Sequence, residues 1–184
     1  LLATVEALAV IGQQGADIFN VTPGAIPIFI DGNDPNGATP GDTVNVSASA
    51  AVTFNAGPQN DEGSFVVTGF QPVSFDHIES VSVTATVASL GATINGTNAD
   101  NDITVIGTGA NDFTVSIDGG PAVQYTDFGS LLVDGLAGDD DIDVELNTLN
   151  LSGNITIRGN QPGSGGADTL TVRGDAGVQA NASW

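Results

Sequence analysis

Apolar and polar residues alternate along nearly the whole chain, in short runs separated by clusters of glycine, asparagine, aspartate and proline. A period of two residues places alternate side chains on opposite faces of a β-strand. No stretch shows the 3.6-residue period with caps that a helix needs. The pattern therefore predicts almost no helix, and strands at residues 5–11, 17–21, 26–30, 42–47, 51–54, 64–68, 79–87, 103–106, 113–117, 122–126, 130–133, 141–146, 154–157 and 168–172.

The chain also repeats itself. Residues 17–46 and 141–172 both begin with Asp-Ile and run through an alternating strand, a Pro/Gly-rich loop and an Asp-Thr-apolar-x-Val strand. Matching positions lie 123 to 126 residues apart: Val10 with Val133, Asp17 with Asp141, and Asp42 with Asp168. A half-copy lies between, since 75–83 matches 125–133. We expect one all-β segment over 1–184, with about one and a half copies of a period of roughly 125 residues and related blocks at 5–46 and 130–172.

Two folds suit such a chain. Repeated short strands joined by tight turns fit a right-handed parallel β-helix or β-roll-like solenoid, in which equivalent side chains of successive coils lie on one another. Such a fold would place Val21, Val46, Val144 and Val172 in internal stacks. Residues 113–128 carry a strong hairpin signal, which we expect to project from the solenoid. The same hairpin supports the alternative, an antiparallel β-sandwich.

The charge of the chain limits its partners. Two arginines, Arg158 and Arg173, and no lysine stand against 22 acidic residues, for a formal charge of −20. Nucleic acids and anionic membrane surfaces attract Lys and Arg, so neither is an expected partner. No apolar run is long enough to span a bilayer, and the first residues lack the features of a signal peptide. With no cysteine and one histidine, His77, we expect no disulfide, no thiolate zinc site and no Ser-His-Asp triad. We expect His77 itself to be a turn or surface residue.

The glycine-aspartate loops point to a family resemblance. Residues 135–143 (GLAGDDDID) and 163–171 (GSGGADTLT) resemble the nonapeptide of the RTX, or haemolysin-type, calcium-binding repeat, and 12–20 and 37–45 resemble it more loosely. The second glycine of the nonapeptide is absent from each, and the copies are not in tandem. The resemblance implies calcium bound by loop oxygens. Alternation would aim Asp139 and Asp141 to one side and Asp140 to the other. The calcium ligands expected from the resemblance are Asp139, Asp140, Asp141, Asp143, Asp168, Asp17 and Asp42.

The wider pattern is similar to repeats of very large bacterial surface and secreted proteins, often adhesin-like. It implies a non-enzymatic structural segment, extracellular or at the cell surface, used for extension, adhesion or fibre assembly. No capping helix is evident, so we expect the coils to stack head to tail on another copy or on neighbouring repeats. A glycan or another surface protein is a further expected partner. The alternatives are a pilin-like or carbohydrate-binding β-sandwich module, and a β-helix polysaccharide lyase or hydrolase.

Overall fold

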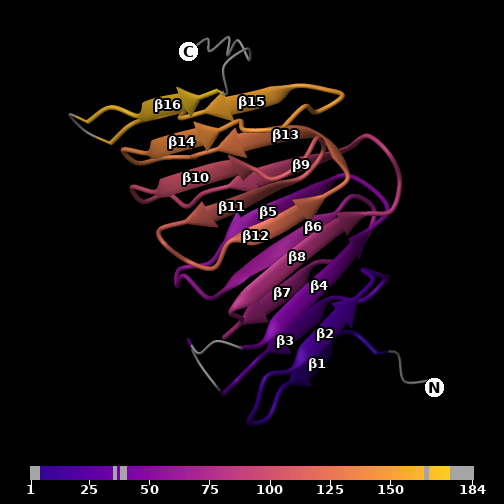
Figure 1. Ribbon diagram of the computed structural model, residues 1–184. Helices are drawn as coiled ribbons and strands as arrows, with labels where there is room; N and C mark the ends of the chain where they lie inside the picture. The colour runs from indigo at the N-terminus through magenta and orange to yellow at the C-terminus, as the bar shows by residue number, and fades with distance from the viewer. Residues whose placement is uncertain (1–4, 35–36, 38–40, 164–165, 175–184) are drawn as a thin grey trace.

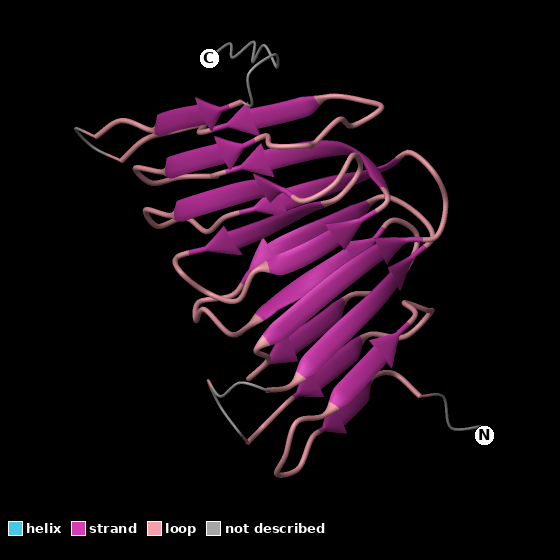
Figure 2. Cartoon of the chain, viewed as in Figure 1, coloured by secondary structure: helices cyan, strands magenta, loops and turns pink. Residues whose placement is uncertain are grey.

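The computed structural model describes residues 5–34, 37, 41–163 and 166–174, and this part of the chain is all-β. Sixteen strands form two eight-stranded mixed sheets, which lie as two layers and do not close into a barrel (Figures 1 and 2). Within these residues no helix has the length and apolar character needed to span a membrane.

The first sheet has the strand order β1–β3–β7–β6–β5–β9–β13–β15. Its strands are β1 (Leu8–Ile11), β3 (Ile28–Asp31), β5 (Val52–Ala56), β6 (Gly63–Val67), β7 (Val73–Asp76), β9 (Leu90–Asn95), β13 (Phe128–Asp134) and β15 (Ile155–Arg158). The second sheet has the order β2–β4–β8–β12–β11–β10–β14–β16. Its strands are β2 (Ile18–Val21), β4 (Thr43–Ala48), β8 (Ser80–Ala85), β10 (Asp102–Gly107), β11 (Phe113–Ile117), β12 (Val123–Thr126), β14 (Asp141–Glu145) and β16 (Thr169–Arg173).

The chain passes repeatedly from the first sheet to the second. Six strand pairs do so through a turn, and we call each pair a level: β1/β2, β3/β4, β7/β8, β9/β10, β13/β14 and β15/β16. The β1/β2 level and the β15/β16 level lie at opposite ends of the structure (Figure 1). The related blocks 5–46 and 130–172 contain β1–β4 and β13–β16, and both alternate between the sheets in this way.

Most strand pairs are parallel. Among the described residues only β6 and β11 run against their neighbours, each as the middle strand of a three-stranded antiparallel unit (β5–β6–β7 and β10–β11–β12). The sheets are therefore mixed, and the arrangement differs from that of an antiparallel sandwich.

The expected hairpin forms, but it does not project. The strands β11 and β12 pair antiparallel and are joined by residues 118–122, where Asp118 and Gly119 have positive φ angles (53° and 70°) and the N–H of Gly120 donates to the carbonyl of Ile117 (2.9 Å). The prediction of a projecting hairpin is wrong, because β12 also pairs with β8 and β11 with β10, so the hairpin lies inside the second sheet. Its strands carry apolar side chains on the core face, which a projecting hairpin would leave in water.

Two strands had not been expected, β7 and β9. Both alternate between apolar and polar or small residues, but β7 has only four residues and follows Pro72, and β9 contains Gly91, residues that weaken a strand prediction. Both are held by long-range pairing, of β7 with β3 and of β9 with β13. These two strands therefore form because of their long-range pairing and not because of local sequence preference.

One core lies between the sheets. Its side chains recur along the parallel strands at aligned positions: Val21, Val46 and Val83 pair in register in one part of the second sheet, and Val105, Val144 and Val172 in another. All except Val21 and Val172, which belong to the end levels, are nearly fully buried. Aromatic rings fill the middle, where Tyr125 of the second sheet meets Phe128 of the first at 5.5 Å between ring centres.

Candidate functional site

A column of carboxylate and amide side chains runs along one flank of the second sheet. One such residue stands directly before the second strand of every level, in the turn that crosses between the sheets. We call this set the turn column: Asp17, Asp42, Glu79, Asn101, Asp140 and Asp168. The strands that follow are parallel and in register within β2–β4–β8 and within β10–β14–β16, so the positions are equivalent within each set of three, and β12 and β11 lie between the two sets.

Hydrogen bonds join the turn column from level to level, always in the same direction. The N–H of Asp17 donates to Oδ1 of Asp42 (2.7 Å), and the N–H of Asp42 donates to Oε2 of Glu79 (2.7 Å).

At the other end of the sheet, the N–H of Asn101 donates to Oδ1 of Asp140 (3.0 Å), and the N–H of Asp140 donates to Oδ1 of Asp168 (3.1 Å). Between these two parts, the hairpin carboxylate of Asp118 accepts from Nδ2 of Asn101 (2.8 Å) and from the N–H of Asp102 (2.8 Å). The carboxylates of Asp42, Glu79, Asp140 and Asp168 thus each satisfy a turn N–H of the neighbouring level.

Glycines make room for these side chains. A Cβ atom on Gly32 would lie 2.6 Å from Oδ2 of Asp42, and one on Gly135 would overlap the carboxylate of Asp140. A Cβ on Gly96 would lie 2.7 Å from Oδ1 of Asn101. The glycines that follow β3, β9 and β13 are therefore required by close approach of the column residue, whereas β7 is followed by His77.

Two column carboxylates are buried. Asp42 is 0% and Asp140 is 1% exposed, and in each Oδ2 has no hydrogen-bond partner within the described part of the chain. Burial raises the pKa of Asp140 above its ordinary value, and the neighbouring carboxylates, Asp168 first, act in the same direction. The hydrogen bond from the N–H of Asn101 opposes this shift.

The seven expected calcium ligands separate into two groups. Asp17 and Asp42 lie at the β1/β2 end of the column, while Asp139, Asp140, Asp141, Asp143 and Asp168 lie near the β15/β16 end. Asp140 points inward and its two neighbours are less buried, as alternation predicted.

The five carboxylates of the second group bond to different partners. Asp139 accepts from the N–H of Gly163 (2.7 Å), Asp141 from the hydroxyl of Thr169, and Asp143 from Arg173 (2.5 Å). No three of the seven come close enough, within the described ranges, to share one ion. Their donor set fits hydrogen bonding to the chain better than a common calcium sphere.

The matching of Asp17 with Asp141 is wrong by one residue. Asp17 occupies the place of Asp140, because each donates its N–H to the column carboxylate of the next level, Asp42 or Asp168. Because residues 139–141 are three consecutive aspartates, the sequence alone does not show which of them matches Asp17. Glu79 and Asn101 were not expected as members of the column; the signal for Asn101 was Gly96 five residues earlier, the spacing also seen before Asp17 and Asp140.

A second cluster surrounds the single histidine. His77 lies in the turn from β7 to β8, as a turn residue was expected to, with φ of 53°. Its Nδ1 is 2.9 Å from Oδ1 of Asp31 and 3.7 Å from Oδ1 of Asp76. The hydrogen bond with Asp31 raises the pKa of His77, and the charges of Asp76, Asp31 and Asp61 add to the shift. Within the described residues, Asp61, Asp76 and His77 bring ligand atoms to within 4.8 Å of one another, a group that can hold a metal ion.

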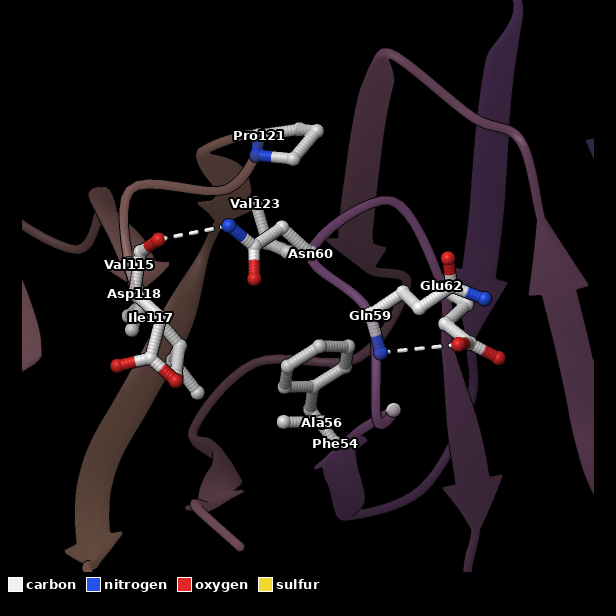
Figure 3. A pocket seen from close by; sticks show the side chains of 11 residues that line it. Phe54, Ala56, Gln59, Asn60, Glu62, Val115, Ile117, Asp118, Pro121 and Val123 are labelled. Carbon is white, nitrogen blue, oxygen red and sulfur yellow. Dashed lines mark hydrogen bonds between the residues drawn. The ribbon is translucent and has the colours of Figure 1, made fainter. Parts of the chain in front are cut away.

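One hollow lies where the two antiparallel units meet (Figure 3). The turn between β5 and β6 faces the β11–β12 hairpin, and Nδ2 of Asn60 donates to the carbonyl of Asp118 (2.8 Å). Phe54, Ile117 and Val123 line it with apolar surface. Its volume of about 30 Å³ has room for roughly one water molecule, far less than a sugar ring needs.

Comparison with known proteins gave no match for this chain, whether to protein-family models, to curated proteins or to solved structures. The site is therefore interpreted from its own geometry.

Proposed function

We propose that this chain is a β-solenoid segment that acts as a non-enzymatic shaft of a secreted or cell-surface protein. In this proposal the levels are the coils of the solenoid, and the two antiparallel units are insertions in its two faces. The segment acts as a spacer: it separates the parts of the protein that bind partners and transmits mechanical force between them.

The observation that carries the proposal is the registered repetition of both the core and the turns. Valines lie on valines along parallel strands, and column carboxylates bond to the turn N–H groups of the next level. Each level contributes one set of aligned core residues and one column residue, so both features favour a fold that extends along a single axis. A binding or catalytic domain instead needs a concave site with convergent groups.

The alternatives need features for which the geometry gives little support. A lyase or glycan-binding site requires a cleft that encloses a sugar. The hollow of Figure 3, in the part of the chain that the structure describes, has room for about one water and is not such a cleft. The buried carboxylates Asp42 and Asp140 accept backbone hydrogen bonds and face glycines of their own turns. Such carboxylates support the fold and are poorly placed for acid–base chemistry on a substrate.

The location is tested on intact cells of the source organism. Antibodies raised against the folded chain should label unpermeabilised cells or detect the protein in the medium. Labelling that requires permeabilisation would contradict the proposal. Incubation of the purified chain with uronate polymers and other polysaccharides should release no unsaturated ends and no reducing sugar, and turnover of any of them would favour the enzyme alternative.

The shape is tested by diffraction from an oriented sample. Eight strands spaced by about 4.8 Å give each sheet an extent of roughly 38 Å along the stack. An oriented sample should therefore diffract at about 4.8 Å along its long axis. A reflection at this spacing across the long axis would contradict a shaft.

A further inference from the structure

We propose that the β15/β16 end of one chain binds the β1/β2 end of a second copy, head to tail, so that both sheets continue in parallel across the junction. This inference rests on the proposed function, since it supplies the partner of the shaft. Three independent features of the two ends support it: their apolar surface, the direction of the turn column and the placement of the only basic residues.

Both ends present core side chains that are covered on one side only. Phe19 and Val21 of β2, and Leu170 and Val172 of β16, pack against the core but stay partly exposed. Their counterparts one level further in, among them Val44, Val46, Ile142 and Val144, are almost fully buried. Of the eight large apolar side chains that are exposed in the described part, five belong to the first levels: Val5, Leu8, Ile11, Ile18 and Phe29. This concentration marks the β1/β2 end as an interaction surface.

The turn column is directional, and its two ends are complementary. At four of the five junctions between levels, the N–H of one level donates to the side chain of the next level toward β16; the exception is the junction between Glu79 and Asn101, where β11 and β12 intervene. Within the described residues, the N–H of Asp168 therefore has no acceptor on the next level, and Oδ1 of Asp17 has no donor from the level before it. The Oδ2 atom of Asp17 accepts the N–H of Gln13 in its own turn (3.2 Å). Placing Asp17 of a second copy over Asp168 repeats the bond that joins each level to the next.

Charge also distinguishes the two ends. Both basic residues of the chain lie in the last level, Arg158 in β15 and Arg173 in β16, and their side chains are 55% and 57% exposed. The β1/β2 end, residues 5–21, carries Glu6 and Asp17 and no base. Arg173 pairs with Asp143 and Glu145, and Arg158 lies near Asp134, so the arginines partly neutralise the acids of the β15/β16 end. A head-to-tail contact therefore joins the end that carries the basic residues to an acidic end. Two β1/β2 ends would bring only acids together, and two β15/β16 ends would bring the arginines together.

The register of the contact follows from the column. With Asp168 over Asp17, Thr169 lies opposite Ile18, Leu170 opposite Phe19, and Val172 opposite Val21. Partly buried positions then meet partly buried ones, and exposed positions meet exposed ones. This is the pattern within the sheet, where β14 and β16 pair Ile142 with Leu170 and Val144 with Val172.

Cross-linking tests the polarity directly, because the chain has no cysteine of its own. Two single-cysteine variants are made, Ile18→Cys and Thr169→Cys, both at exposed positions. A short bismaleimide should link an equal mixture of the two variants into a dimer, and should link neither variant to itself. Self-linking of Ile18→Cys would show that like ends meet and would overturn the proposal. Absence of any linked product at the highest soluble concentration would overturn it too.

A matched pair of charge variants tests whether the β1/β2 edge makes the contact. Ile18→Glu places a carboxylate at the junction, and Val87→Glu places one at a similarly exposed residue between β8 and β9, away from both ends. In sedimentation velocity, Ile18→Glu should abolish the concentration-dependent association, while Val87→Glu should leave it unchanged. Equal loss in both variants would mean that net charge alone governs association, against the proposal. Failure of this contact leaves the surface-labelling result unaffected, so it is distinguishable from failure of the proposed function.

Discussion

Replacement of Asp140 by alanine measures what one carboxylate of the turn column contributes to stability. Its Oδ1 accepts the N–H of Asn101, a residue that is 4% exposed, so alanine leaves a buried donor unsatisfied. Such a donor costs about 1–3 kcal/mol of folding free energy. Alanine also removes a buried charge, as the raised pKa of Asp140 indicates, and this change acts in the opposite direction.

The variant Asp140→Asn separates the two effects, because asparagine removes the charge but keeps an oxygen at Oδ1. We expect Asp140→Ala to be less stable than Asp140→Asn by about 1–3 kcal/mol. For a chain of this length, each kcal/mol lowers Tm by roughly 2–4 °C. Urea unfolding followed by circular dichroism gives the free energies. Asp34→Ala and Asp34→Asn are the matched controls, because Asp34 is exposed, and they should agree within about 0.5 kcal/mol. Equal stability of the two Asp140 variants would refute the role of the hydrogen bond.

The same carboxylate has a pH dependence of defined sign. Because the pKa of Asp140 is raised in the folded state, the folded protein binds this proton more tightly than the unfolded chain does. Stability from this group therefore increases as pH falls from neutral through the folded-state pKa, and is complete below the ordinary value of 3.8. Relative to Asp140→Asn, the natural protein should gain stability between pH 7 and pH 4. A constant difference would contradict the assigned shift.

Four further predictions follow from the turns. Gly135→Ala should destabilise the fold by about 1–3 kcal/mol in urea unfolding, because its Cβ overlaps a column carboxylate; Gly24→Ala, with open space around the Cβ, should be neutral, and equal effects would contradict the close approach. Leu136 has φ of 75°, so Leu136→Asn should raise stability by about 1 kcal/mol, and a lower Tm would contradict this. The single histidine, His77, should titrate by NMR above its ordinary pKa of 6.5. Its contribution to folding stability is then complete below pH 6.5 and is lost as pH rises through the folded-state pKa. Asp31→Asn should lower the pKa of His77, and an unchanged titration in this variant would exclude the pair. If the loop carboxylates bind calcium, a chelator should lower Tm, whereas an unchanged melting curve would show that hydrogen bonds alone hold these turns.

Local pattern predicted much of the fold. The strand β11 was expected at its observed bounds, because Phe113, Val115 and Ile117 alternate with polar residues and a hairpin turn follows. The parallel register of Val144 with Val172 was expected from the repeat. What the sequence could not supply was strand order: nothing local indicates that β5 pairs with β9 while β7 pairs with β3, or that the hairpin closes on β8.

The candidate site was predicted less completely, for the same reason. The sequence singled out aspartates in glycine-rich loops, as calcium ligands and not as acceptors of turn N–H groups, and alternation placed Asp140 on the side opposite to Asp139 and Asp141. Their bonding partners depend on which turns become neighbours, and these turns are 25 to 39 residues apart in the chain. The carboxylate that pairs with His77, that of Asp31, lies at the end of β3, 46 residues away in the chain, so no spacing within the sequence indicated the pair.

The central claim is that column carboxylates hold the levels together by accepting turn N–H groups. The most direct measurement is an NMR experiment that detects coupling across the hydrogen bond, from the amide ¹⁵N of Asn101 to the side-chain carboxyl ¹³C of Asp140. We predict that this coupling is observed, that the corresponding coupling from Asp17 to Asp42 is observed as well, and that both amides exchange slowly with deuterium. Missing couplings together with rapid exchange of these two amides would contradict the account.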